Sequence, residues 1–167
     1  MAGMAAAPVL GCAWPSQAAP IAKTLAFENL HTHETLRTTF WQNGRLVPES
    51  AHAIDHILRD HRTGDIHPIE TDLLHALYEI RHRLMTDAPF QIISGYRSPR
   101  TNTTLASASS GVATRSLHLL GQAIDIRVPG VPLASLHRTA VEMKAGGVGL
   151  YRSSDFVHID VGPVRYW

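Results

Sequence analysis

Two short segments near the C-terminus constrain the fold most tightly. The segments "AIDIRV" (123–128) and "FVHIDV" (156–161) both alternate apolar and polar residues. Successive side chains of an extended strand point to opposite faces, so each strand has one apolar face to bury and one polar face. If the two strands pair, the faces that carry Asp125 and His158 coincide. The pattern predicts a sheet with one face against the core and titratable side chains gathered on the other.

Apolar periodicity indicates the remaining elements. Helices are expected where apolar residues recur at helical spacing, at residues 48–62, 67–85 and 133–147. Further strands are expected at residues 25–30, 35–41, 90–94 and 147–151, with a short one after the Asn43-Gly44 turn, a strong hairpin signal. Residues 99–114 have a short helical start and then loop character. The pattern predicts one α+β domain, an antiparallel β-sheet with helices packed on it.

The first 22 residues differ in character from the rest of the chain. They are mostly small or apolar and carry no charged side chain, which is typical of the apolar and cleavage regions of an export signal. We expect residues 1–22 to be an export-signal remnant or a disordered tail, followed by one domain at 23–167. Val9–Cys12 partly matches a lipoprotein cleavage box, so lipidation of Cys12 stays open. No apolar run is long enough to cross a bilayer, so no stable membrane span is expected.

Composition limits the chemistry that the chain can carry out. Its 15 Lys and Arg nearly balance its 14 Asp and Glu, so nucleic-acid binding through a basic surface is not expected. The single cysteine, Cys12, excludes an internal disulfide and a cysteine zinc cage. Any bound metal must therefore use nitrogen and oxygen ligands, for which the 11 histidines are candidates.

The polar face of the two alternating strands offers such ligands. His118 lies just before the first strand, in "SLHLLGQAID" (116–125), and can fold back over the sheet beside Asp125 and His158. Two imidazoles and one carboxylate with an open fourth position are the arrangement of a catalytic zinc site. The sequence therefore predicts Zn²⁺ on His118, Asp125 and His158. Asp160 shares this face, where it can orient a ligand histidine or hold a turn.

Two more residues fit hydrolysis at such a centre. Asp155 lies three residues before His158, where the chain enters the strand, and a carboxylate there can act as general base for an attacking water. Arg97, in "SGYRS" (94–98), lies in a loop at a strand end and can stabilise the negative charge that develops on an amide oxygen. Taken alone, Asp155 also fits a turn residue, and Arg97 fits an ion pair that closes the loop.

These motifs resemble those of a known enzyme family. "SLHLLGQAID" is similar to the S-x-H-x-x-G-x-A-x-D motif of the zinc D-Ala-D-Ala metallopeptidases, "DFVHID" to their second motif, and "SGYRS" to their arginine-bearing strand end. Within that family the chain is most similar to the YcbK-type murein endopeptidases. The supporting segments are "HTHETL", "LRDHRTGDIHPI", "SGYRSPRTN", "SSGVATRSLH" and "GPVRYW". The resemblance extends from about Leu25 to Trp167.

The resemblance implies a hedgehog/D-Ala-D-Ala peptidase-like fold and a zinc metallopeptidase that cuts the peptide cross-links of peptidoglycan. Its substrate would be the stem peptides, reached in the periplasm or at the cell wall, and we expect a monomer. The implied roles are zinc on His118, Asp125 and His158, general base at Asp155, Arg97 at the scissile carbonyl, and Ser116 as a polar group that binds substrate or orders the loop.

Several alternatives stay open. The same fold can serve as a zinc-containing wall-binding module without turnover, although the acid at position 155 favours an enzyme, or as another zinc wall hydrolase, a carboxypeptidase or an amidase. The sequence does not distinguish D-Ala–diaminopimelate from diaminopimelate–diaminopimelate cross-links. Two other histidine pairs are interpreted as surface residues: His52 and His56 lack the glutamate of helical zinc-protease motifs, and His31 and His33 lack a third ligand.

Overall fold

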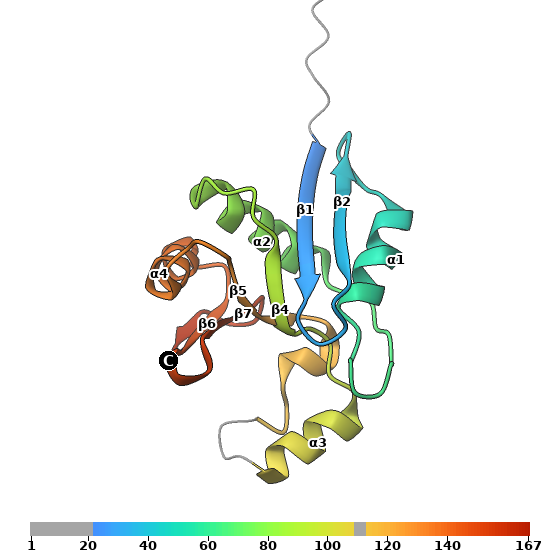
Figure 1. Ribbon diagram of the computed structural model, residues 1–167, viewed down its shortest axis with the longest axis vertical. Helices are drawn as coiled ribbons and strands as arrows, with labels where there is room; N and C mark the ends of the chain where they lie inside the picture. Colours follow the sequence, from blue (N-terminus) through green and yellow to red (C-terminus); the bar gives the residue numbers. More distant parts are fainter. Residues whose placement is uncertain (1–21, 109–112) are drawn as a thin grey trace, which may run out of the picture.

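The computed structural model describes residues 22–108 and 113–167. One eight-stranded sheet runs through this part of the chain in the order β3-β2-β1-β4-β5-β7-β6-β8 (Figure 1). The strands are β1 (Ala22–Asn29), β2 (Thr35–Gln42), β3 (Arg45–Leu46), β4 (Phe90–Ser94), β5 (Ala123–Arg127), β6 (Gly147–Tyr151), β7 (Phe156–Asp160) and β8 (Arg165–Tyr166). The helices are α1 (Pro48–Ile57), α2 (Thr71–Arg83), α3 (Pro99–Ala108) and α4 (Leu133–Met143), with 3-10 turns η1 (Leu117–Leu120) and η2 (Arg152–Ser154).

The sheet is mixed. The predicted α+β class is confirmed, but the prediction of an antiparallel sheet was wrong for two strand pairs, because β1 with β4 and β6 with β8 run parallel. A parallel pair needs a crossover connection, and the chain from β2 to α2 provides one between β1 and β4. The turn at 161–164 carries the chain from β7 to the far edge of β6, where the unforeseen strand β8 pairs. Alternation within a strand reveals its two faces but not its neighbours or their direction.

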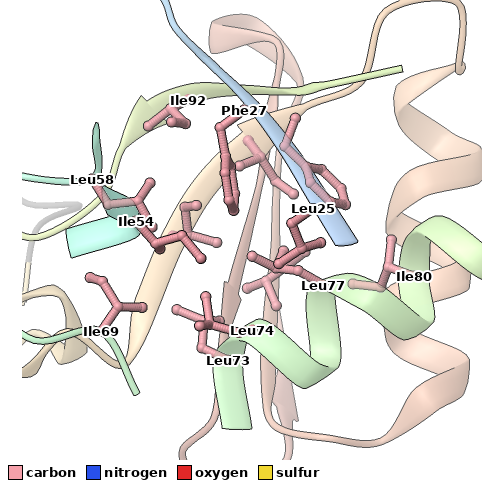
Figure 2. Packing of buried hydrophobic residues seen from close by; sticks show 14 of the residues in the cluster. Leu25, Phe27, Ile54, Leu58, Ile69, Leu73, Leu74, Leu77, Ile80 and Ile92 are labelled. Atoms are coloured by element: carbon pink, nitrogen blue, oxygen red, sulfur yellow. The ribbon is translucent and has the colours of Figure 1, made fainter. Parts of the chain in front are cut away.

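The core lies between the sheet and three helices. Helix α1 packs on β2, α2 on β1, and α4 on β6 and β7. Figure 2 shows Leu73, Leu77 and Ile80 of α2 and Leu25 and Phe27 of β1 in one hydrophobic cluster, and all five side chains are almost completely buried. Burial of this apolar surface is the main source of stability for the fold.

The same core fixes the polar face of the central strands. Ile124, Ile126 and Val157 point into the core, so the alternating neighbours Asp125 and His158 point to the opposite face of the sheet. The pairing that a shared polar face requires is present, because β5 and β7 are adjacent and antiparallel and Asp125 is the register partner of His158. The fold therefore places a carboxylate and an imidazole side by side, away from the helices.

Other expectations meet mixed outcomes. Asn43 and Gly44 both adopt positive φ, 52° and 77°, as the predicted tight hairpin requires. Helix α3 continues to Ala108, which is longer than the short helical start expected there. The predicted export segment lies outside the described residues except for Ala22, which begins β1. Among the described helices, none combines the length and hydropathy needed to cross a membrane.

Candidate metal centre

Three elements bring the predicted zinc ligands together. Asp125 on β5 and His158 on β7 face the same side of the sheet as register partners. His118 lies on η1, just before β5, and contributes the third side chain. All three are largely buried, with relative exposures of 2%, 9% and 1%. A cluster of polar groups buried this deeply needs partners for every hydrogen-bonding atom, and a metal ion is one such partner.

Local turn chemistry positions His118. The Ser116 hydroxyl begins η1 by accepting a hydrogen bond from the His118 N–H, at 3.4 Å. Gly121 ends η1 with a φ of 66°, and a Cβ at that position would collide with the carbonyl oxygen of Pro68. Glycine therefore lets the chain turn from His118 into β5 while passing close to the neighbouring backbone.

The three ligand atoms form a compact triangle. His118 Nε2 lies 3.2 Å from His158 Nδ1 and 3.3 Å from Asp125 Oδ1, and the third side, from His158 Nδ1 to Asp125 Oδ1, is 2.8 Å. Neighbouring ligand atoms of a tetrahedral zinc ion are about 3.3 Å apart. The donor set and its spacing therefore fit zinc. Within residues 22–108 and 113–167, no other group of three such side chains converges in this way.

The ring orientation of both histidines is fixed by hydrogen bonds behind them. His118 Nδ1–H donates to the carbonyl oxygen of Gly95 at 2.7 Å, so its Nε2 lone pair points to the centre. His158 Nε2–H donates to Asp160 Oδ2 at 2.9 Å, so its Nδ1 lone pair points there too. Carbonyl and carboxylate partners of this kind set the tautomer of metal-binding histidines.

The charges around the centre suit a metal ligand set. Burial lowers the pKa of His118, with the Asp125 charge opposing this in part. Burial alone would raise the pKa of Asp125, but His118, His158 and Arg97 together hold it well below its usual range. For His158, burial would lower the pKa, but the carboxylates of Asp125 and Asp160 outweigh burial and raise the pKa, so bound zinc would take the place of a proton on Nδ1. Asp125 is therefore a carboxylate and His118 a neutral imidazole at neutral pH, the forms in which these groups bind zinc.

Arg97 lies directly beside the ligands. Its Nη2 donates to Asp125 Oδ2, and its Nε donates to Ser94 Oγ at 2.8 Å. Its backbone N–H also donates to the carbonyl oxygen of His118 at 3.1 Å. The loop after β4 and the η1 turn are therefore tied together, and the predicted oxyanion donor lies next to the metal-binding carboxylate.

The ligands lie in a cleft of about 320 Å³. Its lining combines cationic and polar groups with aromatic groups. Besides the three ligands, its lining consists of Arg97, Ala113, Arg115, Ser116, Leu117, Tyr151, Phe156, Arg165 and Trp167. A cleft of this volume with convergent polar groups suits a peptide-sized substrate.

The structure does not bring the carboxylate of Asp155 into this cleft. Asp155 ends η2 in the left-handed conformation, with a φ of 53°. Its carboxylate accepts a hydrogen bond from Arg127 Nη1 at 2.9 Å, and the two side chains are 62% and 40% exposed. Asp155 therefore lies at the entry to β7, next to the cleft residue Phe156, with its carboxylate turned to Arg127.

The rival histidine pairs lie elsewhere. His52 and His56 are exposed on α1. His31 stacks on His61 with ring centroids 3.7 Å apart, and its Nε2–H donates to the carbonyl oxygen of Ile93 at 3.0 Å. Neither pair acquires a third ligand in the described part of the chain.

Comparison with known proteins identifies the family. A family model described as "Peptidoglycan L,D-endopeptidase MepK" matches residues 17–167. The chain belongs to this MepK family of peptidases. The peptidoglycan L,D-endopeptidase MepK of Escherichia coli (strain K12) is 40% identical over 155 residues, which cover 93% of this chain and 85% of that relative. A probable peptidoglycan L,D-endopeptidase MepK of Haemophilus influenzae is 38% identical over 149 residues, or 89% and 80% of the two chains.

Family membership confirms the resemblance to murein endopeptidases that the motifs indicated. Seven residues of the cleft were nevertheless not predicted: Ala113, Arg115, Leu117, Tyr151, Phe156, Arg165 and Trp167. Arg165 and Trp167 reach the cleft because β8 folds back onto β6, which side-chain periodicity does not reveal. The aromatic residues of "GPVRYW", so soon after a ligand-bearing strand, were the one sequence signal that pointed to them.

Proposed function

We propose that the chain is a zinc-dependent peptidoglycan endopeptidase that hydrolyses cross-links between stem peptides. The observation that carries the proposal is the triangle of His118, Asp125 and His158 in the cleft of a MepK-family chain. Zinc in such a site acts as a Lewis acid and makes water a usable nucleophile at neutral pH. The three ligands leave one position of a tetrahedral ion open, as catalytic zinc sites do.

The bond that we propose is the diaminopimelate–diaminopimelate cross-link. Its carbonyl belongs to the L centre of one residue and its nitrogen to the D centre of the next, so the bond has L,D configuration. The D-Ala–diaminopimelate cross-link joins two D centres instead. Relatives named L,D-endopeptidases align with this chain over 155 and 149 residues, and that support favours the first bond.

Arg97 is proposed to stabilise the scissile carbonyl oxygen. An arginine has five N–H donors, and the side-chain hydrogen bonds of Arg97 to Ser94 and Asp125 use two of them. The guanidinium lines the cleft and is held against a ligand of the proposed metal. A positive donor fixed in this way is placed to act as negative charge develops on the amide oxygen.

Asp155 is proposed as the general base, and Ser116 as a polar contact for the substrate. The role of Asp155 requires its carboxylate to leave Arg127 and turn into the cleft. Breaking an exposed pair of this kind costs about 1 kcal/mol or less, and the next residue, Phe156, already lines the cleft. Ser116 lines the cleft, next to Arg115 in the chain.

The proposal also covers location and organisation. Peptidoglycan lies outside the cytoplasmic membrane, so we propose that residues 1–22 act in export and that residues 23–167 form the zinc peptidase domain, acting in the periplasm or at the wall. We also propose that the chain acts as a monomer. Size-exclusion chromatography with light scattering tests the monomer directly.

Defined muropeptide dimers test the function. The zinc-loaded full chain is incubated with one dimer that holds a diaminopimelate–diaminopimelate bond and one that holds a D-Ala–diaminopimelate bond, and products are identified by mass spectrometry. We expect monomers from the first dimer and an intact second dimer. Release of D-Ala from monomers would instead identify a carboxypeptidase, and release of stem peptides from the glycan an amidase. One zinc per chain with no bond cut would favour the wall-binding module.

A further inference from the structure

Three aromatic residues line the cleft, and one of them lies beside the proposed metal ligand His158. The indole of Trp167, which follows β8, lies 5.3 Å from the imidazole of His158, centroid to centroid. Tyr151 and Phe156, at facing ends of β6 and β7, stack on each other at 4.6 Å and line the same cleft. Trp167 itself is 49% exposed. A large apolar surface is therefore presented next to the reacting centre instead of being buried in the core.

The position of the indole is fixed by several hydrogen bonds. The Trp167 backbone N–H donates to the carbonyl oxygen of Val148 at 3.2 Å, and the Trp167 carbonyl oxygen accepts from the Leu150 N–H at 2.9 Å. The backbone of Trp167 therefore extends the pairing of β8 with β6. Its indole Nε1–H donates to the Tyr151 hydroxyl at 2.9 Å. A half-exposed aromatic ring held in one orientation loses little conformational entropy on binding, which is a property of good recognition residues.

Gly149 shows that the sheet makes room for this ring. Gly149 is the register partner of His158 in the adjacent strand. A Cβ at position 149 would lie 2.5 Å from Trp167 Cε2 and 2.6 Å from its Nε1. The indole therefore lies against bare backbone at the β6 position next to His158, and any side chain there would displace it.

We infer that Trp167, seated over Gly149, forms a substrate subsite that packs against the methylene chain of a diaminopimelate residue at the scissile bond. This inference rests on the proposed function. The chain of methylene groups is the apolar part of that residue. Its free carboxylate suits the guanidinium groups that line the same cleft, those of Arg97, Arg115 and Arg165. An aromatic face for the methylene groups and guanidinium groups for the carboxylate together match the chemistry of diaminopimelate.

Kinetic coupling between Trp167 and the substrate tests the inference. Two further L,D-linked peptides are used: one has L-alanine in place of the diaminopimelate that supplies the carbonyl, and the other has D-alanine in place of the one that supplies the nitrogen. We expect Trp167→Leu to raise KM for the full cross-link about 10-fold, with little change in kcat. On the peptide that lacks the contacted methylene chain, wild type and Trp167→Leu should have the same raised KM. The inference would be overturned if Trp167→Leu raised KM by the same factor on both alanine-containing peptides as on the full cross-link. It would also be overturned if Trp167→Leu left KM for the full cross-link unchanged.

Two variants separate recognition from structure. Gly149→Ala keeps the indole but displaces it, and should reproduce the rise in KM. Trp41→Phe changes a tryptophan on β2, away from the cleft, and should behave as wild type. Zinc content and melting temperature should be unchanged in Trp167→Leu, and loss of either would assign Trp167 a structural role and contradict the subsite.

A binding measurement separates the subsite from the proposed activity. In a Trp14→Phe, Trp41→Phe chain, Trp167 is the remaining tryptophan, so its fluorescence reports the subsite alone. We expect a saturable change in emission when the diaminopimelate-containing stem peptide is added, and none with a stem peptide that has alanine in its place. An emission change without hydrolysis of any dimer would preserve the subsite and reject the endopeptidase. No emission change despite hydrolysis would do the reverse.

Discussion

The carboxylate of Asp160 lies directly behind the imidazole of His158, with Oδ2 2.9 Å from Nε2. Its other oxygen accepts hydrogen bonds from the backbone N–H groups of Gly147, at 3.0 Å, and Gly162, at 2.9 Å. Arg165 pairs with both oxygens, at 3.1 and 2.7 Å. Because the carboxylate is fixed from several directions, it fixes the plane of the imidazole and thereby the direction of His158 Nδ1. Asp160 both orients the histidine and holds the turn that follows it.

Removing Asp160 should weaken zinc binding. We expect Asp160→Ala to lower zinc affinity about 10- to 100-fold, the usual cost of losing the partner behind a metal-binding histidine. Asp160→Asn retains an oxygen acceptor and should lower zinc affinity by a smaller factor. Zinc titration against a competing chelator measures both. The exposed Asp87→Ala is the matched control and should bind zinc as wild type does; equal affinity in Asp160→Ala would contradict the orienting role.

Kinetics can separate the roles of Asp155 and Arg127, although the two side chains pair with each other. If Asp155 is the base, Asp155→Ala should lower kcat about 10²- to 10⁴-fold. Arg127→Ala should leave kcat near wild type, because it removes the partner that holds the carboxylate away from the cleft. Steady-state hydrolysis of the L,D-linked dimer gives both values. If the two variants have the same small effect, Asp155 is half of a surface ion pair and the base lies elsewhere.

Arg97 should matter for the reaction more than for the metal. Arg97→Gln removes the charge beside Asp125 Oδ2 but none of the three ligand atoms. We expect kcat to fall about 10²-fold, as when an oxyanion donor is removed, with zinc content still one per chain. Elemental analysis and kinetics on the same preparation measure the two effects. Loss of zinc in step with loss of activity would show that Arg97 serves the metal site and not the transition state.

Asp60 anchors the loop that carries Arg97 and should make stability depend on pH. Its buried carboxylate accepts hydrogen bonds from the backbone N–H groups of Ser98 and Arg62, both at 2.9 Å. Burial alone would raise the pKa of Asp60, but hydrogen bonds from Thr101, Ser98 and Arg62 hold it well below its usual range. A depressed folded-state pKa adds stability above the unfolded-state value of about 4, and this stability is lost as the pH falls.

Urea unfolding of Asp60→Asn measures that contribution. At pH 7 we expect the free energy of unfolding to fall by about 1–3 kcal/mol. The difference from wild type should shrink as the pH falls below about 4, because the Asp60 carboxylate of the unfolded chain then binds a proton while that of the folded protein is still ionised. The control Asp65→Asn changes an exposed residue of the same loop and should show little effect. A difference that is constant from pH 7 to pH 3 would exclude the charge of Asp60 as its cause.

The convergence of Asp125 and His158 on one face could be predicted because the alternation that places each side chain is local. Alternation in "AIDIRV" and "FVHIDV" put Asp125 and His158 on polar faces, and the pairing of β5 with β7 then brought them together. The Asn43-Gly44 turn specified its hairpin for the same reason, since both residues tolerate positive φ. Where the residue types and their spacing decide the geometry, the sequence was sufficient.

The rest depends on contacts between distant segments. The carbonyl oxygen of Gly95 accepts a hydrogen bond from His118 only because the loop after β4 packs beside η1. Trp167 reaches the cleft only because β8 pairs with the far edge of β6. The carboxylate of Asp155 pairs with Arg127, which lies on another strand. Neither periodicity nor motif spacing encodes which strand becomes a neighbour or where an exposed carboxylate turns, so these features required the structure.

The most direct test is whether cleavage of the diaminopimelate–diaminopimelate dimer depends on zinc at His118, Asp125 and His158. Cleavage by the full chain is followed after zinc is removed with a chelator and again after one equivalent is restored. We predict that activity is lost and then recovered in wild type and in His52→Ala, which changes an exposed histidine on α1. His118→Ala should neither bind zinc at the site nor recover. Full cleavage by the metal-free chain or by His118→Ala would contradict the account.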